Sequence, residues 1–421
     1  MARPQPQPFQ VFRVGGSVRD ELLGRANADR DFVVVGATPE MMVASGFTPV
    51  GRDFPVFLHP ETHEEYALAR TERKHGQGYH GFEFFASPEV TLEVDLRRRD
   101  LTINAMARRP DGTLVDPFGG ERDLNERVLR HVSASFVEDP LRVLRVARFA
   151  SRLGFDVAPE TRKLMRTIVE SGELATLAPE RVWQEISRGL MEAQPSRMFQ
   201  VLRECGALVL LLPEFDALFG VRLPARQHPE RDAGEHLLLV ADRAADRALG
   251  LAARYAALAQ NVGADVAPAL ETRTAVTRAE AMSVRLKVPA ECRDAARLAA
   301  RWHRALDRLP SLTSAKVLAL LQGTDALRRP ERLLTLLDAA VANVCADPVA
   351  AKAWPPARLL VAALERVKAV DAGAIARVAT GTRAGRGADN VIAKALREAR
   401  LRALREWKRE EAAARPRRKR R

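Results

Sequence analysis

The spacing of apolar residues changes near Glu138, and this change most constrains the fold. Before it, "VFRVGG", "RDFVVVG", "EYALAR" and "VTLEVDL" predict short strands between glycines and prolines, while "SVRDELLG" and "TPEMMVASG" predict helices. After it, apolar residues recur at three- and four-residue spacing, as in "DPLRVLRVARFASRLGF" and "PERVWQEISRGLMEA". The sequence therefore predicts an α+β fold: a head with a small mixed sheet, followed by a long all-helical region.

Composition indicates a soluble protein with a polyanionic partner. Lys and Arg outnumber Asp and Glu by 67 to 54 in 421 residues, a formal charge of +13, which favours nucleic acid or nucleotides over a merely solvated basic surface. The three cysteines are widely spaced, which fits a reducing cytoplasm. With no signal peptide and no apolar run of about 18 residues, the expectation is a cytoplasmic protein without a membrane segment.

The stretch "NADRDFVVVG" places two carboxylates directly before an apolar strand. Alternate residues of a strand share a face, so Asp29 and Asp31 are expected to point the same way. Two carboxylates on one face repel each other unless a cation lies between them, and Mg²⁺ prefers such oxygen ligands together with substrate phosphates. Alone, this pattern is weak, because the two aspartates could simply face water.

Upstream, "VGGSVRDELLG" runs from a strand ending at Val14 through two glycines into a helix. Ser17 is the expected N-cap, with Asp20 as its capping-box partner, and Gly24 is expected to end the helix. The glycines allow a ligand to approach the backbone, and Arg19 adds a guanidinium for a phosphate. A phosphate site beside an aspartate pair implies a nucleoside triphosphate and two-metal nucleotidyl transfer.

Two later stretches concentrate arginine. "EDPLRVLRVAR" predicts a helix with Asp139 as N-cap and Pro140 as its first residue, and its arginines fall on one helical stripe: Arg142, Arg145, Arg148 and Arg152. "DLRRRDLTINAMA" contains three consecutive arginines, which cannot all be core residues and must in part face solvent or a ligand.

Together these motifs resemble the class II tRNA nucleotidyltransferases, the CCA-adding enzymes of the polymerase-β-like superfamily. "GGSVRDELLG", "DRDFVVVG", "DLRRRDLTINAMA", "DPFGGERDLNERVLRHV", "EDPLRVLRVARFASRLGF" and "PERVWQEISRGL" occur in the family's order, and the match is dense from Val11 to about Val240. The resemblance implies addition of C, C and A to the 3′ end of tRNA from CTP and ATP, with Mg²⁺ as cofactor.

The resemblance also implies roles for individual residues. Asp29 and Asp31 would be catalytic and hold the metal, and Asp139 with Arg142 would read the base edge as a template made of protein. A third metal-site carboxylate is left open between Glu65 and Asp95. The full set implied to bind the nucleotide is Gly16, Arg19, Arg99, Asp139, Arg142, Arg145 and Arg148.

Farther along, "HPERDAGEHLLLVADRAADRALGLAARYAALAQNVGAD" resembles the HD domain of long bacterial CCA-adding enzymes. His236 matches the first metal ligand, but Gln260–Asn261 stands where a His-Asp pair belongs, and an amide is a poor ligand for a divalent ion. We therefore expect an HD-like helical fold without its metal or its phosphohydrolase activity, with His228, Asp232 and His236 structural or facing RNA. A residual metal site at these residues is the alternative.

The expected domains are a nucleotidyltransferase head at 1–137, a helical neck and body at 138–222, a degenerate HD-like domain at 223–330, and a helical tail at 331–421 that ends in the basic "RPRRKRR". A glycine-rich hairpin at 71–85 is expected to be flexible. Alternatives are a bacterial poly(A) polymerase, a catalytically silent RNA-binding protein and an HD phosphohydrolase. The oligomeric state does not follow from the sequence.

Overall fold

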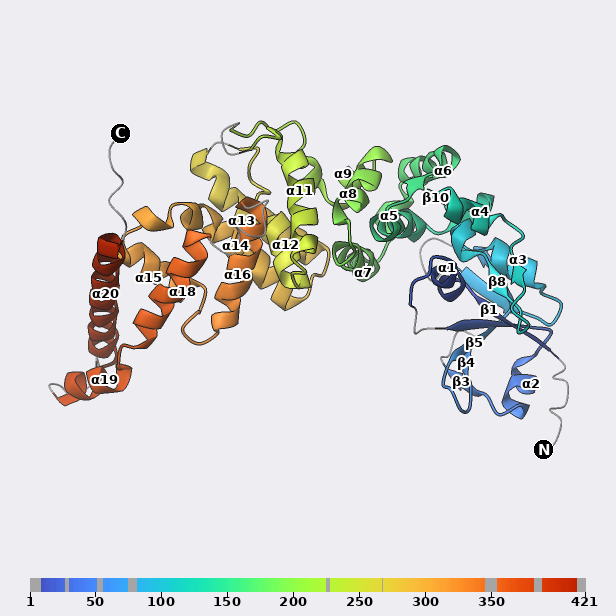
Figure 1. The fold of residues 1–421 in the computed structure, drawn as a ribbon, viewed down its shortest axis with the longest axis horizontal. Helices are drawn as coiled ribbons and strands as arrows, with labels where there is room; N and C mark the ends of the chain where they lie inside the picture. Colours follow the sequence, from blue (N-terminus) through green and yellow to red (C-terminus); the bar gives the residue numbers. More distant parts are fainter. Residues whose placement is uncertain are drawn as a thin grey trace. The chain divides into compact units, whose positions relative to one another are not determined.

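A computed structural model describes residues 9–26, 30–50, 56–74, 82–224, 228–266, 268–344, 354–381 and 388–414. The chain divides into two compact units, Met1–Asp216 and Ala217–Arg421 (Figure 1). The predicted architecture, a mixed-sheet head followed by a largely helical region, is confirmed. The domain boundaries within it stay predictions.

The head is built on a mixed sheet. In the described part of the chain, seven strands lie in the order β3 (Thr48–Val50), β4 (Val56–Leu58), β5 (Glu65–Leu68), β2 (Asp31–Val35), β1 (Gln10–Val14), β8 (Ala107–Arg108) and β9 (Leu114–Val115). β2 and β5 are parallel, and β1 pairs antiparallel with β2 and β8. β6 (Arg70–Lys74) and β7 (Phe82–Ala86) form the hairpin predicted at 71–85, whose Gly76, Gly78 and Gly81 lie outside the described residues.

Strand β2 is buried on both faces of this sheet. Val33 belongs to a core cluster with Phe12 and Leu96, whereas its neighbour Val34 belongs to a second cluster with Met42 and Leu68. Successive strand residues point to opposite faces, so a strand covered on both sides needs a continuous apolar run. This requirement explains the apolar run "FVVV". Asp31, the first residue of β2, therefore lies at the end of a strand that is packed on both sides.

One predicted strand is wrong. "VTLEVDL" forms helix α3 (Leu92–Arg97), in which the Thr91 hydroxyl accepts a hydrogen bond from the Val94 N–H and Glu93 lies in the first turn. An N-cap threonine and an early acidic residue favour a helix start, and in so short a segment they outweigh the alternation of apolar residues.

Two predicted caps are also corrected. Helix α1 (Gly16–Leu22) has Gly15 as N-cap without a side-chain cap, and Ser17 Oγ instead donates to the Val14 carbonyl at 3.1 Å. Helix α5 (Leu141–Leu153) begins one residue later than expected, with Pro140 at the N-cap position, although Asp139 Oδ1 still accepts from the Leu141 N–H at 3.0 Å. The predicted end of α1 is confirmed, since Gly24 follows it with a φ of +66°.

The rest of the first unit is mainly helical and packs on α5. Helices α7 and α8 contact α5 directly, and β10 pairs in parallel with β11. The remaining elements are α2 (Pro39–Ala44), η2 (Thr102–Asn104), α4 (Gly120–Asn125), β10 (Val128–Leu129), η3 (Ala134–Glu138), β11 (Asp156–Val157), α6 (Pro159–Glu170), η4 (Glu173–Thr176), α7 (Pro179–Leu190), α8 (Pro195–Glu204), α9 (Leu208–Leu211) and α10 (Pro213–Asp216).

Among the described residues of the second unit, the regular elements are helices, apart from an isolated bridge between Arg222 and Asp232. Helix α12 packs against α11, α14 and α16. The elements are α11 (Ala233–Asp246), α12 (Leu251–Ala259), α13 (Pro268–Arg285), α14 (Ala290–Asp307), η5 (Leu309–Ser311), α15 (Ser314–Gly323), α16 (Pro330–Val344), α18 (Pro355–Lys368), α19 (Ala372–Gly381) and α20 (Ala388–Ala414). The basic "RPRRKRR" segment lies outside the described residues.

Among the described helices, none combines the length and the apolar character that crossing a membrane would require.

Candidate active site

A cavity of about 470 Å³ lies within the first unit, between the end of β1, the start of β2, the segment after α3, and helices α5 and α7. It is lined by Gly15, Gly16, Arg19, Asp31, Arg98, Arg99, Asp100, Asn104, Asp139, Leu141, Arg142, Arg145, Arg148, Phe149, Arg152 and Arg181. Every described residue of the predicted site is in this set. The remaining predicted residue, Asp29, lies outside the described residues.

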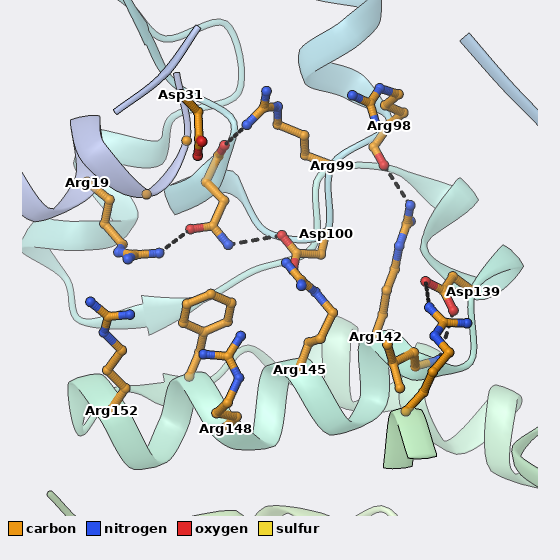
Figure 2. A pocket seen from close by; sticks show the side chains of 16 residues that line it. Arg19, Asp31, Arg98, Arg99, Asp100, Asp139, Arg142, Arg145, Arg148 and Arg152 are labelled. Atoms are coloured by element: carbon orange, nitrogen blue, oxygen red, sulfur yellow. Dashed lines mark hydrogen bonds and ion pairs between the residues drawn. The ribbon is translucent and has the colours of Figure 1, made fainter. Parts of the chain in front are cut away.

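The lining is strongly basic. Among the described residues, eight arginines and three aspartates line the cavity. Figure 2 shows Arg142, Arg145, Arg148 and Arg152 extending from one face of α5 toward Asp31, Arg99 and Asp100. The predicted helical stripe of arginines is therefore confirmed. Such a concentration of guanidinium groups in a concave site attracts polyanions.

The turn between β1 and α1 needs glycine for two reasons. Gly15 has a φ of +70°, a conformation that costs other residues free energy, and a Cβ at this position would lie 2.7 Å from Arg99 Nη1. Arg99 Nη1 in turn donates to the Asn104 carbonyl at 3.3 Å. Gly15 thus lets the predicted triphosphate-binding arginine lie against the backbone, a role that the sequence analysis did not give to this residue.

Arg19 is held by a buried network. Its Nε donates to Asp20 Oδ1 at 2.9 Å, and its Nη1 donates to Asn104 Oδ1 at 2.5 Å. Asp20 is 1% exposed and also accepts from Arg152 Nη2 at 2.9 Å. Burial lowers the pKa of Arg19, and the neighbouring Asp20 carboxylate opposes that shift, so the guanidinium stays charged. Asp20 therefore connects α1 to α5.

A second carboxylate, Asp100, positions Arg145. Asp100 Oδ2 accepts from Arg145 Nε at 2.7 Å, while Oδ1 accepts from the Asn104 Nδ2 amide at 3.0 Å. Burial by itself would raise the pKa of Asp100, but Arg145 and the Asn104 hydrogen bond outweigh it and hold this pKa well below its usual range. Asp100 is consequently ionised at neutral pH and fixes the orientation of the Arg145 guanidinium.

The predicted base-reading residues lie at the start of α5. Arg142 is buried and donates from Nη1 to the Ser135 carbonyl at 2.9 Å and from Nη2 to the Arg98 carbonyl at 2.6 Å. Asp139 is partly exposed, and its Oδ2 lies 3.9 Å from Arg181 Nη2 of helix α7. The structure therefore brings Asp139 and Arg142 to one wall of the cavity.

Arg148 is fixed by helix α7. Its Nε donates to Glu185 Oε2 at 2.6 Å, both side chains are buried, and its guanidinium carbon lies 4.7 Å from the centre of the Phe149 ring. Glu185 and Arg181 both come from "PERVWQEISRGL". The motif was recognisable in the sequence, whereas the roles of these two residues depend on contacts that form only in the folded protein.

Glu65 and Asp95, the two candidates for a third metal-site carboxylate, lie in different surroundings. Glu65 of β5 is the direct parallel partner of Asp31 in the sheet, and its side chain is exposed. Asp95 is fully buried and pairs with Arg98 and Arg99 at 2.9 and 3.3 Å, and neither Asp95 nor Glu65 is among the described residues that line the cavity. Carboxylate oxygens at the ends of adjacent strands suit a hard divalent cation, so this structure favours Glu65 over Asp95.

In the second unit, polar groups of the HD-like region face one another. Gln260 is buried and donates to the Ala257 carbonyl at 2.8 Å, while Asn261 Nδ2 donates to Asn343 Oδ1 at 2.7 Å. Asp232 caps α11 by accepting from the N–H groups of Gly234 and Glu235 at 2.9 Å. Of the two amides predicted to replace the His-Asp pair, Asn261 bonds to Asn343, whereas Gln260 bonds to backbone carbonyls. Asp232 has the structural role that was one of its two predicted roles.

The fold and the site define a class. Residues 11–130 match the family model described as the poly A polymerase head domain, and residues 154–219 match the one described as the probable RNA and SrmB-binding site of polymerase A. The fold is similar to that of "CCA-adding enzyme apo form II", with a TM-score of 0.67 and 23% identity over 96% of this chain and 92% of that one. The fold is also similar to that of the Bacillus stearothermophilus CCA-adding enzyme in complex with CTP, with a TM-score of 0.63 and 24% identity over 96% of this chain and 95% of that one. The chain thus has the polymerase-β-like nucleotidyltransferase fold.

Sequence relatives narrow the class to a family. The multifunctional CCA protein of Aromatoleum aromaticum is 57% identical over 382 residues, which span 88% of this chain and 94% of the relative. That of Burkholderia pseudomallei is 53% identical over 412 residues, 94% of this chain and 98% of the relative. The chain belongs to the multifunctional CCA protein family.

Proposed function

We propose that this protein is a CCA-adding tRNA nucleotidyltransferase, which transfers CMP from CTP and AMP from ATP to the 3′-hydroxyl of tRNA and releases pyrophosphate. One observation carries the proposal: a single cavity is lined by Asp31, by the β1–α1 turn, and by Asp139 and Arg142. The groups needed at the reacting phosphate, along the triphosphate and at the base thus surround one volume. The names of the family relatives support the same reaction.

The triphosphate binds among the arginines. Arg19 and Arg99 line the cavity beside Gly15 and Gly16, where the absence of side chains leaves the backbone accessible. Because Asp20 and Asn104 already orient Arg19, little rotamer entropy is lost when a phosphate binds. We assign Gly16, Arg19 and Arg99 to the triphosphate and ribose, and Arg145 and Arg148 to the base or the phosphates.

Asp29 and Asp31 hold a divalent metal, which we propose is Mg²⁺, with Glu65 as the third carboxylate. When bound, Mg²⁺ neutralises charge on the triphosphate and favours ionisation of the attacking hydroxyl. Asp31 is suited to this role because it is the first residue of a strand buried on both faces, which keeps the carboxylate in one place at the edge of the cavity.

Asp139 and Arg142 select the base. A carboxylate accepts from the exocyclic amino group of cytosine or adenine, and a guanidinium donates to a ring nitrogen or a carbonyl. Uracil and guanine present a carbonyl and an N–H where those groups belong, so buried polar groups would be left mispaired. The Ser135 and Arg98 carbonyls hold Arg142, which supports a template whose geometry is set before the nucleotide binds.

The helical regions and the basic tail bind tRNA mainly through phosphates, which would make the affinity fall steeply with salt. The second matched family region, described as a probable RNA-binding site, supports this for residues 154–219. We place the reaction in the cytoplasm, where tRNA and nucleoside triphosphates occur together. The HD-like region takes no part as a phosphohydrolase in this proposal.

The test is product length on a tRNA transcript that lacks its 3′ CCA, with CTP and ATP supplied together and separately. The proposal expects growth by three nucleotides with both, addition of C alone from CTP, and no product from Asp31→Asn. A long A ladder from ATP alone would instead identify a poly(A) polymerase. Tight tRNA binding without extension would identify a silent RNA-binding protein.

A further inference from the structure

Two histidines and a glutamate converge in the second unit. His236 on α11 is 3% exposed, and its Nδ1 lies 2.5 Å from Glu230 Oε1. His228 Nδ1 lies 3.1 Å from the same oxygen, and the two imidazole rings are 4.5 Å apart at a near-perpendicular angle. One potential ligand atom from each residue lies within 4.8 Å of the other two.

The opposite side of the His236 ring determines which nitrogen carries hydrogen. His236 Nε2 lies 2.9 Å from Asn343 Oδ1, and Asn261 Nδ2 donates to that same oxygen at 2.7 Å. Asn343 Oδ1 is therefore an acceptor, and the His236 Nε2–H donates to it. In a neutral imidazole the other nitrogen is a bare acceptor. His236 Nδ1 then faces a carboxylate oxygen, and two lone pairs repel each other unless a proton or a metal cation lies between them.

We propose that His228 Nδ1, Glu230 Oε1 and His236 Nδ1 bind a divalent transition-metal ion of the zinc class. Two imidazoles and a carboxylate are ligands that zinc accepts, and tetrahedral bonds of its usual length place such atoms about 3.4 Å apart. The present separations of 2.5 and 3.1 Å need to widen by less than about 1 Å. His228 is 22% exposed, so an ion and a completing water can enter from solvent.

Asn343 supplies the outer support that such a site needs. A metal-bound histidine usually donates its second N–H to an oxygen, which orients the ring and strengthens the ligand. His236 has this arrangement through Nε2 and Asn343.

This site differs from the HD metal site that the sequence predicts to be lost. Asn261, from the replaced His-Asp pair, bonds to Asn343 on the Nε2 side of His236, whereas the proposed ion lies on the Nδ1 side. The ion would connect the segment before α11 to α11 itself, on either side of the helix cap at Asp232. We assign it a structural role, and this inference is independent of the proposed function.

The test uses the full-length protein after treatment with a chelator. Co²⁺ is titrated in excess Mg²⁺, which occupies oxygen-rich sites such as the aspartates of the head, and binding is followed by the visible absorption of histidine-bound Co²⁺. We expect one Co²⁺ per chain, displaced by Zn²⁺, and affinity reduced by at least about tenfold in His228→Ala and in Glu230→Gln.

Matched controls separate this site from general effects. Glu235→Gln removes an exposed carboxylate from the same helix, and His63→Asn removes an exposed histidine from the first unit, so both should bind Co²⁺ as the wild type does. Far-UV circular dichroism confirms that each variant is folded. Absence of the Co²⁺ spectrum, or a spectrum that His228→Ala and Glu230→Gln leave unchanged, overturns the proposal and means that a proton alone occupies the gap beside Glu230.

Discussion

Two buried polar networks in this molecule are built from different chemical groups. Around the cavity of the first unit, the carboxylates Asp20, Asp100 and Glu185 each orient at least one arginine. In the HD-like region of the second unit, neutral amides from Asn261 and Asn343 bond to each other beside His236. Of the two, only the first has more arginines than carboxylates among its described residues, which suits a phosphate-rich substrate.

The largest expected effect tests the first network at Asp31. Asp31→Asn should reduce nucleotide incorporation by about 10³-fold or more, because an amide cannot replace the anionic metal ligand. Single-turnover incorporation of CMP into tRNA lacking CCA measures it. Glu61→Gln, an exposed acid in the same sheet region, serves as the control. Comparable activity in Asp31→Asn and Glu61→Gln would remove Asp31 from the mechanism.

Base selection should be the next most sensitive property. Arg142→Ala and Asp139→Ala should each reduce the preference for CTP over UTP by about 10²-fold, since mispaired groups no longer penalise the wrong base. The ratio of kcat/KM for the two nucleotides is the measurement. Arg166→Ala on α6, outside the cavity, is the matched control. An unchanged ratio in both test variants would show that the base is read elsewhere.

Gly15→Ala should raise KM for CTP by about tenfold, because the added Cβ displaces Arg99 in addition to straining the backbone. Gly36→Ala is a close control: Gly36 also has a positive φ, +83°, but nothing lies within 4 Å of an added Cβ. The difference in KM between the two variants isolates the contact with Arg99. Equal KM values in the two variants would mean that Gly15 matters only for its backbone conformation and not for the contact with Arg99.

The Asp100–Arg145 pair should make a pH-dependent contribution to stability. The pKa of Asp100 is lowered in the folded protein, so the pair stabilises the fold above the unfolded value of about 3.9, and that stability is lost as the pH falls below it. Urea midpoints of wild type and Asp100→Asn, measured from pH 7 to pH 2, should therefore stay apart above about pH 4 and approach each other below it. A gap that widens in acid would contradict the ion pair.

The last prediction concerns the network around Asn261 and Asn343, where we expect no phosphohydrolase activity. Hydrolysis of a chromogenic phosphomonoester or of a cyclic phosphodiester with added Mg²⁺, Zn²⁺ or Co²⁺ should equal the rate without protein. The reason is that amides stand where a His-Asp pair would bind the metal. Metal-dependent hydrolysis that disappears in His236→Ala would show that the amide network still supports catalysis.

Local sequence determined much of this protein. Strands β1, β2 and β5 and the helices after Glu138 follow from the period of apolar residues, which depends only on neighbours along the chain. The arginine stripe on α5 follows from helical geometry for the same reason. Where segments were short, local signals conflicted: "VTLEVDL" reads as a strand by alternation, but the Thr91 cap makes it a helix.

Only the tertiary structure decided how distant residues cooperate. Asp20 accepts from Arg152, which is 132 residues away, and Asn104 joins Arg19 to Asp100. The strand register that places Asp31 beside Glu65, and the hydrogen bond between Asn261 and Asn343, likewise depend on which strands and helices lie side by side. No periodic pattern encodes such pairs, because they arise from packing between elements. Sequence could thus identify the chemical groups, and packing decided which of them face each other.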